Sequence, residues 1–428
     1  MRKNAVTISE ATYKQWIDRY QNGKLVPFIG SPSSITPAKK SDITHLSPVK
    51  RASYKITGKA LEQSGGLTCI VLAGGTGGRF FGYDLPEAER IKFLAPILKY
   101  KQQDWSPGSV RLCYMQHSYP HTTVDIVCGD HNAKFFEHAV LQAAKCPNAA
   151  TGQLNIYAKN SIPRFNPTTD DIAAANIFAD TEGLRSPAKL RQRALQAAAK
   201  NGVIGGPFYS KNGAVSMHGP GHLFALLTYM LNGRMKTDIQ TNRHVVMLCS
   251  GENLGAMPNH ALLGYLATES CDSLAIVSTR INDKGILVRN AKKPILCEKS
   301  QLPDGPVAQN AHYTNANTFY YKIPALCKLL KLTPKEFIRT NSSDLLHLVQ
   351  EHIIQKLTPI VEIKPVFFSK TDVRYCGQFT LPANALTSLF TAIDYIWQDR
   401  SVCIYDLKTQ KDVPAAQSLM GQLIDEVT

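Results

Sequence analysis

The stretch Leu67-Thr-Cys-Ile-Val-Leu-Ala-Gly-Gly-Thr-Gly-Gly-Arg79 runs from an apolar segment directly into a loop with four glycines. A short apolar run that ends in glycine predicts a buried β-strand over Leu67–Leu72. Glycines after such a strand let backbone N–H groups approach a phosphate or a base where a Cβ would clash. We therefore expect a phosphate- or nucleotide-binding loop here; a glycine-rich turn without a ligand is the alternative.

Two familiar phosphate-binding patterns do not fit this loop. The dinucleotide pattern would need a third glycine at the position of Phe80. The P-loop pattern would need a lysine at the position of Tyr83, directly after Gly82. The loop is therefore expected to be of another type.

Beyond the loop, short apolar runs alternate with helical patterns. The predicted strands are Leu67–Leu72, Val110–Met115, Thr123–Val127, Leu154–Ala158, His244–Cys249 and Leu274–Ser278. The predicted helices are Asn132–Lys145, Pro187–Lys200, His222–Leu231 and His260–Ser270, and the second of them carries Ser186 as N-cap and Pro187 at its first position. This alternation predicts an α/β fold with a mostly parallel, mixed sheet and helices on both faces.

The composition supports a sizeable core and a basic surface. Of the 428 residues, 44% are hydrophobic and only 19% charged, which excludes a mainly disordered chain. The 48 Lys and Arg exceed the 33 Asp and Glu, so the net charge is +15 and an acidic partner is expected: nucleic acid, anionic lipid or a phosphorylated small molecule.

The charge is concentrated at the start of the chain. Residues 1–64 hold eleven Lys or Arg and four Asp or Glu. We expect these residues to form a basic N-terminal region, with a short helix over Ala11–Tyr20 and an extended arm after it. Residues 65–392 are expected to form the main domain and residues 393–428 a short C-terminal extension.

The sequence predicts a cytoplasmic protein. It contains no run of about 18 apolar residues, and its first residues turn polar too soon for a signal peptide. The ten cysteines are scattered singly, without a Cys-x-x-Cys pair or zinc-ligand spacing, so reduced thiols are expected.

The glycine-rich loop, Arg79 and Lys92 together resemble the sugar-nucleotide pyrophosphorylases. Proteins of that family have a Leu-x-Gly-Gly-x-Gly loop, then an Arg, then a Lys before a hydrophobic-Pro run, as in Ile91-Lys-Phe-Leu-Ala-Pro96 here. Later motifs, up to Phe390, are similar to the UTP–glucose-1-phosphate uridylyltransferase (UDP-glucose pyrophosphorylase) branch. The resemblance implies a nucleotidyltransferase fold of the GT-A, Rossmann-like type.

Two motifs in the middle of the chain extend the resemblance. The segment Ser161-Ile-Pro-Arg164 is similar to the family's Gln-Ser-x-x-Pro-Arg, with Lys159 in place of the uridine-contacting Gln. The segment His218-Gly-Pro-Gly-His222 is similar to Pro-Pro-Gly-His-Gly-Asp. Gly221 would present a backbone N–H at a helix N-terminus, which favours an anion, and His222 would donate to a sugar phosphate. A helix cap or a surface histidine is the alternative reading of His222.

Three later motifs follow in the family's order. The segment Ser250-Gly-Glu-Asn-Leu-Gly255 resembles Asn-x-Asp-Asn-Leu-Gly, whose acidic residue binds Mg²⁺ and nucleotide phosphate, so Glu252 is the implied metal ligand or, alternatively, an exposed loop acid. Asn315 and Asn317, at alternate positions, are expected on one face of a strand, where they would bind sugar hydroxyls. Lys370 is the implied phosphate contact or else an ordinary surface lysine, and Thr380 replaces a family Glu.

The resemblance implies a Mg²⁺-dependent enzyme that forms a UDP-sugar and pyrophosphate from UTP and a hexose 1-phosphate, with glucose 1-phosphate favoured. No protein nucleophile is needed, because the sugar phosphate attacks the α-phosphorus in line. The implied residues are Arg79, Lys92 and Lys370 for catalysis; Leu72, Ala73, Gly74, Gly75, Lys92, Lys159, Gly221, Glu252 and Lys370 for UTP; His222, Ser250, Gly251, Asn315 and Asn317 for the sugar phosphate; and Glu252 for the metal.

Other functions remain open from the sequence. The replacements at Lys159, Ser250, Glu252 and Thr380 favour, as the main alternative, a nucleotide-sugar-binding protein that has lost catalysis. A nucleic-acid-binding protein would rest on net charge alone, and a glycosyltransferase would usually carry an Asp-x-Asp motif, which the sequence lacks. We expect no nucleic-acid or membrane partner. The family's C-terminal β-helix domain is not evident, so the oligomeric state is open.

Overall fold

The computed structural model describes residues 8–24, 34–73, 114–115, 117–128, 154–158, 162–168, 170–171, 203–209, 213–218, 221–251, 253–280, 285–291, 293–298, 301–302, 307–367, 373–381, 385, 387–405 and 418–419. Its helices are α1 (Glu10–Gln21), α2 (Pro48–Gln63), α8 (His222–Leu231), α9 (Arg234–Gln240), α10 (His260–Thr268), α11 (Val307–Asn310), α12 (Ile323–Leu329), α13 (Pro334–Arg339), α14 (Ser342–His352) and α16 (Arg400–Cys403).

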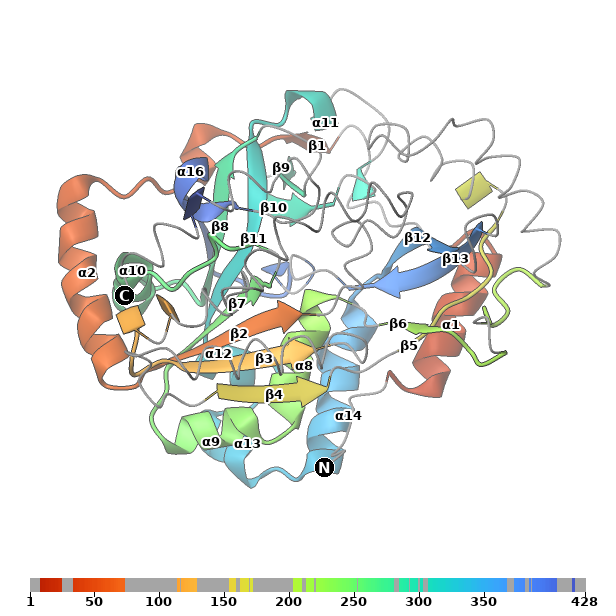
Figure 1. Cartoon of the computed structure of the whole chain (residues 1–428), viewed down its shortest axis with the longest axis horizontal. Coiled ribbons are helices and arrows are strands. Elements are labelled where there is room, and N and C mark those ends of the chain that lie inside the picture. Colours follow the sequence, from red (N-terminus) through yellow and green to blue (C-terminus); the bar gives the residue numbers. More distant parts are fainter. Residues whose placement is uncertain are drawn as a thin grey trace.

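A large mixed sheet runs through the centre of the molecule (Figure 1). Four parallel strands lie in the order β4 (Leu154–Ala158), β3 (Thr123–Cys128), β2 (Leu67–Ala73) and β7 (Val245–Ser250). Next to β7 comes β11 (Tyr313–Lys322), which is antiparallel to it and to β8 (Ser273–Thr279). The strand β14 (Ile393–Trp397) then pairs parallel to β8. At the start of β11, Thr314 pairs with Ile286 of β9 (Ile286–Asn290). The strand β9 in turn pairs with β1 (Ile35–Pro37) and with β10 (Lys293–Cys297).

Two small antiparallel strand pairs lie outside this sheet. The strands β12 (Ile360–Phe367) and β13 (Val373–Thr380) form one of them, and β5 (Ile162–Pro163) and β6 (Met217–His218) form the other. In Figure 1 both lie beyond the arrowheads of β2 and β3, so they face the carboxyl ends of the parallel strands.

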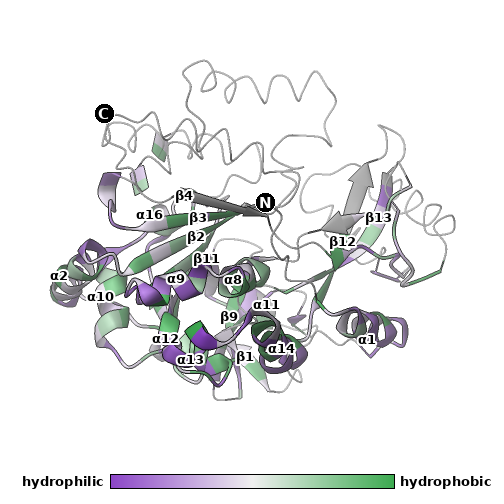
Figure 2. Cartoon of the chain, turned by 90° about the horizontal axis from the view of Figure 1, so that it is seen from below, coloured by the Kyte–Doolittle hydropathy of each residue, from purple (hydrophilic) through white to green (hydrophobic). Residues whose placement is uncertain are grey.

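Both faces of the central sheet are buried under helices. Ile70 and Leu72 of β2 pack in the same apolar cluster as the wholly apolar face of α8, whereas Cys69 and Val71 pack in a second cluster with α10. Alternate residues of a strand point to opposite faces, and a strand covered on both faces is therefore mostly apolar, as β7 is up to Cys249. Figure 2 shows the same distribution: β2 and β3 are mostly green, while α1 and α9 carry much purple.

A buried ionic network lies near the amino ends of the parallel strands. Asp238 of α9 is fully buried and accepts hydrogen bonds from the Thr68 hydroxyl (2.6 Å) and the Tyr229 hydroxyl (2.8 Å). Arg234 bridges Asp238 (3.2 Å) and Asp125 of β3 (3.1 Å). Burial, with Asp238 adding to it, raises the pKa of Tyr229. The network joins α8, α9, β2 and β3 at the amino edge of the parallel strands, whereas the glycine-rich loop follows β2 at its carboxyl end in the sequence. Charges buried in this way are stable only as hydrogen-bonded pairs.

The α/β fold class is confirmed, and most of the predicted elements that fall on described residues are present. The helix His222–Leu231 has the predicted bounds, as does the strand Leu154–Ala158, and the remaining confirmed elements differ by one or two residues at an end. The predicted strand Val110–Met115 is wrong at its end, because Tyr114 and Met115 are helical and the Tyr119 N–H donates back to the Met115 carbonyl at 2.9 Å. The helices predicted over 132–145 and 187–200 lie outside the described residues.

The expected extended arm is wrong for the second half of the N-terminal region. Residues 48–63 form α2, which begins with Ser47 as N-cap and Pro48 at its first position. The predicted first helix is present as α1, and its Trp16 and Tyr20 are buried in the main apolar cluster. Both helices therefore pack on the body of the protein, and their lysines and arginines lie on its surface.

The expected boundary at residue 393 also does not coincide with an edge of the fold. Ile393 is the first residue of β14, which pairs with β8 over five residues within the central sheet. Its Tyr395 and Ile396 are buried, because the strand is covered on both faces. The start of the expected C-terminal extension is therefore part of the main sheet.

Candidate active site

The carboxyl ends of β2 and β7 form the floor of the candidate site. Leu72 pairs with Ser250 in the parallel ladder, and the Gly251 N–H donates to the Leu72 carbonyl at 2.7 Å. A Cβ on Gly251 would lie 2.6 Å from that carbonyl oxygen, so only glycine permits this approach. The structure thus brings together Leu72, Ala73, Ser250 and Gly251, which the sequence predicted as neighbours in one site.

The Asn253 side chain holds the loop after β7 in place. This amide is 1% exposed; its Nδ2 donates to the carbonyls of Ala316 (3.2 Å) and Cys403 (2.8 Å). Its Oδ1 accepts from the N–H groups of Gly255 (3.1 Å) and Tyr405 (2.8 Å). All four hydrogen-bonding positions of the amide are thus satisfied. The sequence predicts no role for Asn253 beyond its place in the motif Ser250–Gly255. The turn-forming run Asn-Leu-Gly is the feature of the sequence that could have indicated a structural role.

The two asparagines of β11 adopt a different arrangement from the expected one. Asn317 has a left-handed backbone (φ 53°), and the pairing of β11 with β8 shifts register between Asn315 and Phe319. The Asn315 Nδ2 donates to the Asn317 Oδ1 (2.7 Å), and the Asn317 N–H donates to the Asn315 Oδ1 (2.9 Å). The bulge interrupts the regular alternation of the strand, but the two amides still lie side by side, because they are hydrogen-bonded to each other. Each amide keeps unused donor or acceptor positions.

The N-terminus of α8 approaches the hairpin β12–β13. Gly221 is the N-cap residue of α8, with a φ of 108° that strains any other residue. A Cβ there would lie 2.9 Å from the Leu381 carbonyl oxygen and 3.2 Å from Thr380 Cγ2. His222 is the first residue of the helix, as predicted, and is half-buried. The N–H groups and the dipole of a helix N-terminus favour an anion.

The hairpin β12–β13 adds a carboxylate and an amide beside this helix terminus. Glu362 of β12 accepts hydrogen bonds from the Gln378 Nε2 and from the Thr380 hydroxyl, each at 3.0 Å. Thr380, which stands where the family has a Glu, is thus hydrogen-bonded to a carboxylate on the adjacent strand. Gln378 is 8% exposed, and no group within the described part of the chain donates to its Oε1. The contacts of Glu362 with Gln378 and with Thr380 could not be predicted from the sequence, because they depend on the register of β12 against β13.

Two of the sequence motifs meet through the antiparallel strand pair β5–β6. Arg164, at the end of the motif Ser161–Arg164, donates from its backbone N–H to the Ser216 carbonyl (2.8 Å) and from Nη1 to the Ser216 hydroxyl (3.1 Å). Ser216 lies just before β6, which leads to Gly221. The pairing thus joins the two motifs.

The helix α1 packs against the hairpin β12–β13 through aromatic side chains. Phe379 of β13 makes edge-to-face contacts with Trp16 (ring centroids 5.5 Å apart) and Tyr13 (5.8 Å), and Phe165 lies 4.6 Å from it. Burial raises the pKa of the Tyr13 phenol to about 12, so this side chain stays neutral. Aromatic contacts of this kind fix the hairpin and with it the positions of Glu362 and Gln378.

The remaining predicted site residues lie outside the described part of the chain: Gly74, Gly75, Arg79, Lys92, Lys159, Glu252 and Lys370. Within the described residues no group of three or more His, Cys, Asp or Glu side chains could hold a metal ion, and no helix there is long and apolar enough to cross a membrane.

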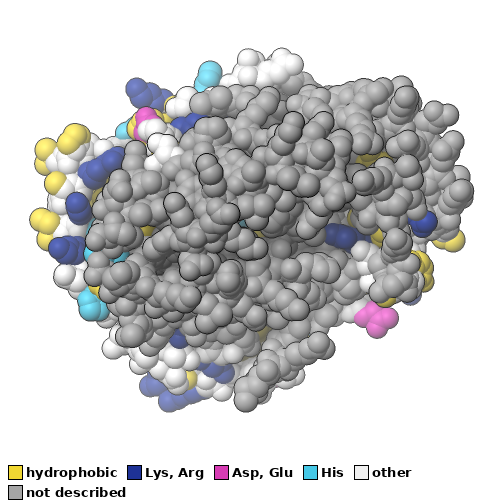
Figure 3. Space-filling view, viewed as in Figure 1, with side chains coloured by type: hydrophobic (Ala, Val, Ile, Leu, Met, Phe, Trp, Pro, Cys, Tyr) yellow, Lys and Arg dark blue, Asp and Glu magenta, His cyan; other side chains and the backbone are white. Residues whose placement is uncertain are grey.

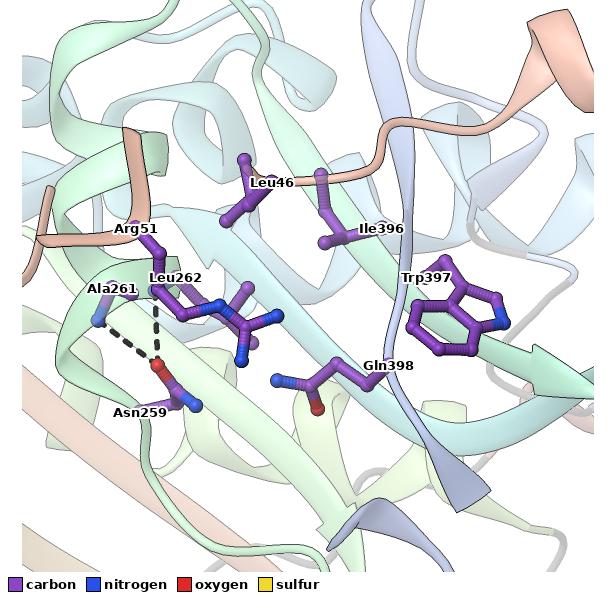
Figure 4. A pocket seen from close by; sticks show the side chains of 8 residues that line it. All are labelled: Leu46, Arg51, Asn259, Ala261, Leu262, Ile396, Trp397 and Gln398. Carbon is purple, nitrogen blue, oxygen red and sulfur yellow. Dashed lines mark hydrogen bonds between the residues drawn. The ribbon is translucent and has the colours of Figure 1, made fainter. Parts of the chain in front are cut away.

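A separate hollow lies between α2, α10 and β14, and the side chains of Arg51, Asn259, Trp397 and Gln398 line part of it (Figure 4). The Asn259 side-chain oxygen is engaged as the N-cap of α10, where it accepts from the N–H groups of Ala261 (2.9 Å) and Leu262 (3.3 Å). None of the predicted site residues lines this hollow, so it is distinct from the candidate active site.

Comparisons with known proteins identify the fold. No family model matches the sequence, and no curated protein matches it. Solved structures do match: a point variant of UDP-glucose pyrophosphorylase from Leishmania major, at 16% identity, covers 97% of this chain and 76% of its own, with a TM-score of 0.59. UDP-N-acetylglucosamine pyrophosphorylase from Trypanosoma brucei, at 12% identity, covers 96% and 75%, with a TM-score of 0.58. A Trypanosoma brucei protein named UDP-glucose phosphorylase, at 14% identity, covers 95% and 79%, also with a TM-score of 0.58. This chain therefore has the fold of the UDP-sugar pyrophosphorylases, as the sequence motifs implied.

Proposed function

We propose that the protein is a nucleotidyltransferase that joins UTP and a hexose 1-phosphate into a UDP-sugar and pyrophosphate. The observation that carries the proposal is the convergence of Leu72, Ser250 and Gly251 at the carboxyl edge of the sheet, on a fold shared with UDP-sugar pyrophosphorylases. In open α/β sheets ligands bind at this edge. Two variants of the Leishmania major enzyme were solved in complex with UDP-glucose, which makes a UDP-sugar the first ligand to test.

The binding roles follow from the types of residue. The backbone of Leu72, Ala73, Gly74 and Gly75 would hold the uracil, with Gly221 beside it and Lys159 near the nucleotide. His222, Ser250 and Gly251 would hold the sugar phosphate, and the paired amides of Asn315 and Asn317 would bind the sugar hydroxyls through their unused positions. Gln378 joins this proposed set, because its side-chain oxygen is left without a donor among the described groups.

The reaction would need positioning and charge neutralisation but no protein nucleophile. An oxygen of the sugar phosphate attacks the α-phosphorus of UTP, and the bond from that phosphorus to the pyrophosphate oxygen breaks in line. Arg79, Lys92 and Lys370 would neutralise the charge that builds up on the phosphates. Mg²⁺, held by the Glu252 carboxylate and by phosphate oxygens, would supply further charge neutralisation.

Glu252 is the residue that would hold such a metal. In the sequence Glu252 stands between two residues that are held in place. The Gly251 N–H donates a hydrogen bond to the Leu72 carbonyl, and the Asn253 side-chain amide makes four hydrogen bonds. Mg²⁺ is usually held by one or two carboxylates together with substrate phosphates, so a cluster of several protein ligands is not required.

The test is formation of pyrophosphate from UTP and Mg²⁺ with glucose, galactose or N-acetylglucosamine 1-phosphate. We expect turnover, with glucose 1-phosphate the favoured substrate, and we expect Lys92→Ala to lower kcat by about 10²–10³. The exposed Lys335 of α13 provides the control, and Lys335→Ala should keep full activity. Full activity of Lys92→Ala would refute the role of Lys92. Binding of UTP without release of pyrophosphate would instead favour a nucleotide-sugar-binding protein without catalysis.

A further inference from the structure

The outer side of α2 is basic and carries two bulky apolar side chains in solvent. Val49 is 81% exposed and Ile56 is 75% exposed. The same helix exposes Lys50, Arg51, Lys55 and Lys59. Its one acidic residue, Glu62, is only 2% exposed, so the charge of the exposed side is wholly positive. Figure 3 shows yellow and dark blue side chains together along the edge where Figure 1 draws α2.

The helix is held to the body of the protein by a narrow strip of its surface. A Cβ on Gly58 would lie 1.7 Å from the His260 carbonyl oxygen, and a Cβ on Gly264 of α10 would lie 1.8 Å from the Tyr54 carbonyl oxygen. The backbones of α2 and α10 therefore touch at these two glycines. The Tyr54 hydroxyl adds a hydrogen bond to Glu269 at 2.5 Å. Because contact is confined to this strip, the rest of α2 stays exposed while the helix is fixed in place.

The exposed residues are spaced for contact with one flat surface. Val49 and Ile56 are seven residues apart, which places them on the same side of the helix about 10 Å from each other. Lys55 and Lys59 are one turn apart and lie on one side of Ile56, and Lys50 lies on the other side. A helix that presents apolar side chains between lysines can insert the former among lipid headgroups while the latter contact phosphates.

We propose that the outer side of α2 docks the protein peripherally on an anionic lipid surface. Charge complementarity selects this partner: a second copy of this chain would bring two basic helices together in a protein with a net charge of +15. A nucleic acid would pair with the lysines but would offer its phosphate backbone, not an apolar partner, to Val49 and Ile56. The surface is independent of the proposed active site. It also modifies the expectation of no membrane partner, which was based on the lack of a membrane-spanning segment.

The test is co-sedimentation of the purified protein with vesicles of phosphatidylcholine alone or mixed with phosphatidylserine. We expect binding to the mixed vesicles only, weakening as salt rises. The variant Lys55→Gln/Lys59→Gln should bind about 25-fold more weakly, because each basic side chain at an anionic surface strengthens binding about five-fold. Ile56→Ser should weaken binding several-fold without a change of charge.

A matched variant separates this site from overall charge. Lys335→Gln/Arg339→Gln removes two exposed basic residues one turn apart on α13 and should leave vesicle binding unchanged. The proposal is overturned if the wild type binds phosphatidylcholine alone equally well, or if the α2 and α13 variants weaken binding to the same extent. It is overturned too if the protein binds duplex DNA or an acidic peptide through α2 more tightly than it binds the mixed vesicles. Vesicle binding needs no turnover, so pyrophosphate formation by the same preparation tests the proposed function separately.

Discussion

The buried amide of Asn253 connects three segments that are distant in the sequence. It joins the loop after β7, the bulge of β11 and the chain that leaves α16, through the carbonyls of Ala316 and Cys403 and the N–H of Tyr405. A buried polar group of this kind stabilises the fold only because every one of its partners is satisfied. Its neighbour in sequence is Glu252, the metal ligand that the resemblance implies, so under the proposed function Asn253 would hold the segment that carries this ligand.

We expect Asn253→Ala to lower the free energy of unfolding by about 3 kcal/mol, because its four partners, two buried and two half-buried, lose their hydrogen bonds. Urea denaturation measures this change. The control is Asn341→Ala, which removes an exposed N-cap of α14 and should cost about 1 kcal/mol. Equal losses in the two variants would mean that the Asn253 amide is not a structural tie.

Among the elements, the pair α2 and α10 shows how glycine determines the distance between helices. Gly58 and Gly264 face each other where the helices cross, and the Gly58 backbone nitrogen would lie 2.9 Å from a Cβ on Gly264. Glycine within a helix usually lowers its stability by about 1 kcal/mol relative to alanine. Here the close approach requires glycine at both positions, and Leu262, Leu263 and Leu266 of α10 are buried in the same apolar cluster as residues of β2 and β7.

Gly58→Ala should therefore destabilise the protein, although alanine is the better helix former. A methyl group 1.7 Å from the His260 carbonyl cannot be accommodated without moving the helices apart, and we expect a loss of about 3 kcal/mol or more. Thermal unfolding followed by circular dichroism measures it. Thr57→Ala, at the adjacent exposed position, should be neutral or slightly stabilising. A stabilised Gly58→Ala variant would show that the two helices are not in contact.

At the scale of the whole molecule, the environment of His260 beside Glu62 makes the free energy of unfolding depend on pH. The His260 Nε2 lies 4.0 Å from the Glu62 carboxylate, whose other oxygen accepts from the His121 N–H at 2.9 Å, so the contact joins α2, α10 and the start of β3. Burial lowers the pKa of His260 below its ordinary value of 6.5, although Glu62 acts in the opposite direction. The folded protein therefore binds a proton at this site less readily than the unfolded chain.

The free energy of unfolding should fall as pH drops below about 6.5, because protons then bind the unfolded state preferentially. The decrease should continue until the pH reaches the lowered pKa of His260 in the folded state. We expect His260→Gln to reduce this slope in urea denaturation curves recorded between neutral and mildly acidic pH. His347→Gln, whose side chain is 79% exposed, should leave the slope unchanged. An unaltered slope in His260→Gln would assign the acid sensitivity to other groups.

The sequence by itself determined the elements whose signals are local. Apolar runs predicted β2, β3, β4, β7 and β8, and the Gly-Pro-Gly before His222 marked the start of α8 with its observed bounds. The glycine loop and the order of the motifs implied a UDP-sugar pyrophosphorylase fold that the solved structures confirm. The helix α2 could also have been predicted, because Ser47-Pro48 repeats the cap signal that was recognised at Ser186-Pro187.

Only the tertiary structure decided how these elements meet. The bonded pair Asn315–Asn317 depends on a register shift between β11 and β8, and the carboxylate beside Thr380 comes from Glu362 on the adjacent strand. The contact of Gly58 with α10 and the burial of Asn253 likewise join residues more than 60 positions apart in the chain. Strand and helix signals are local because they arise from neighbouring residues, whereas register and helix distance arise from packing between distant segments.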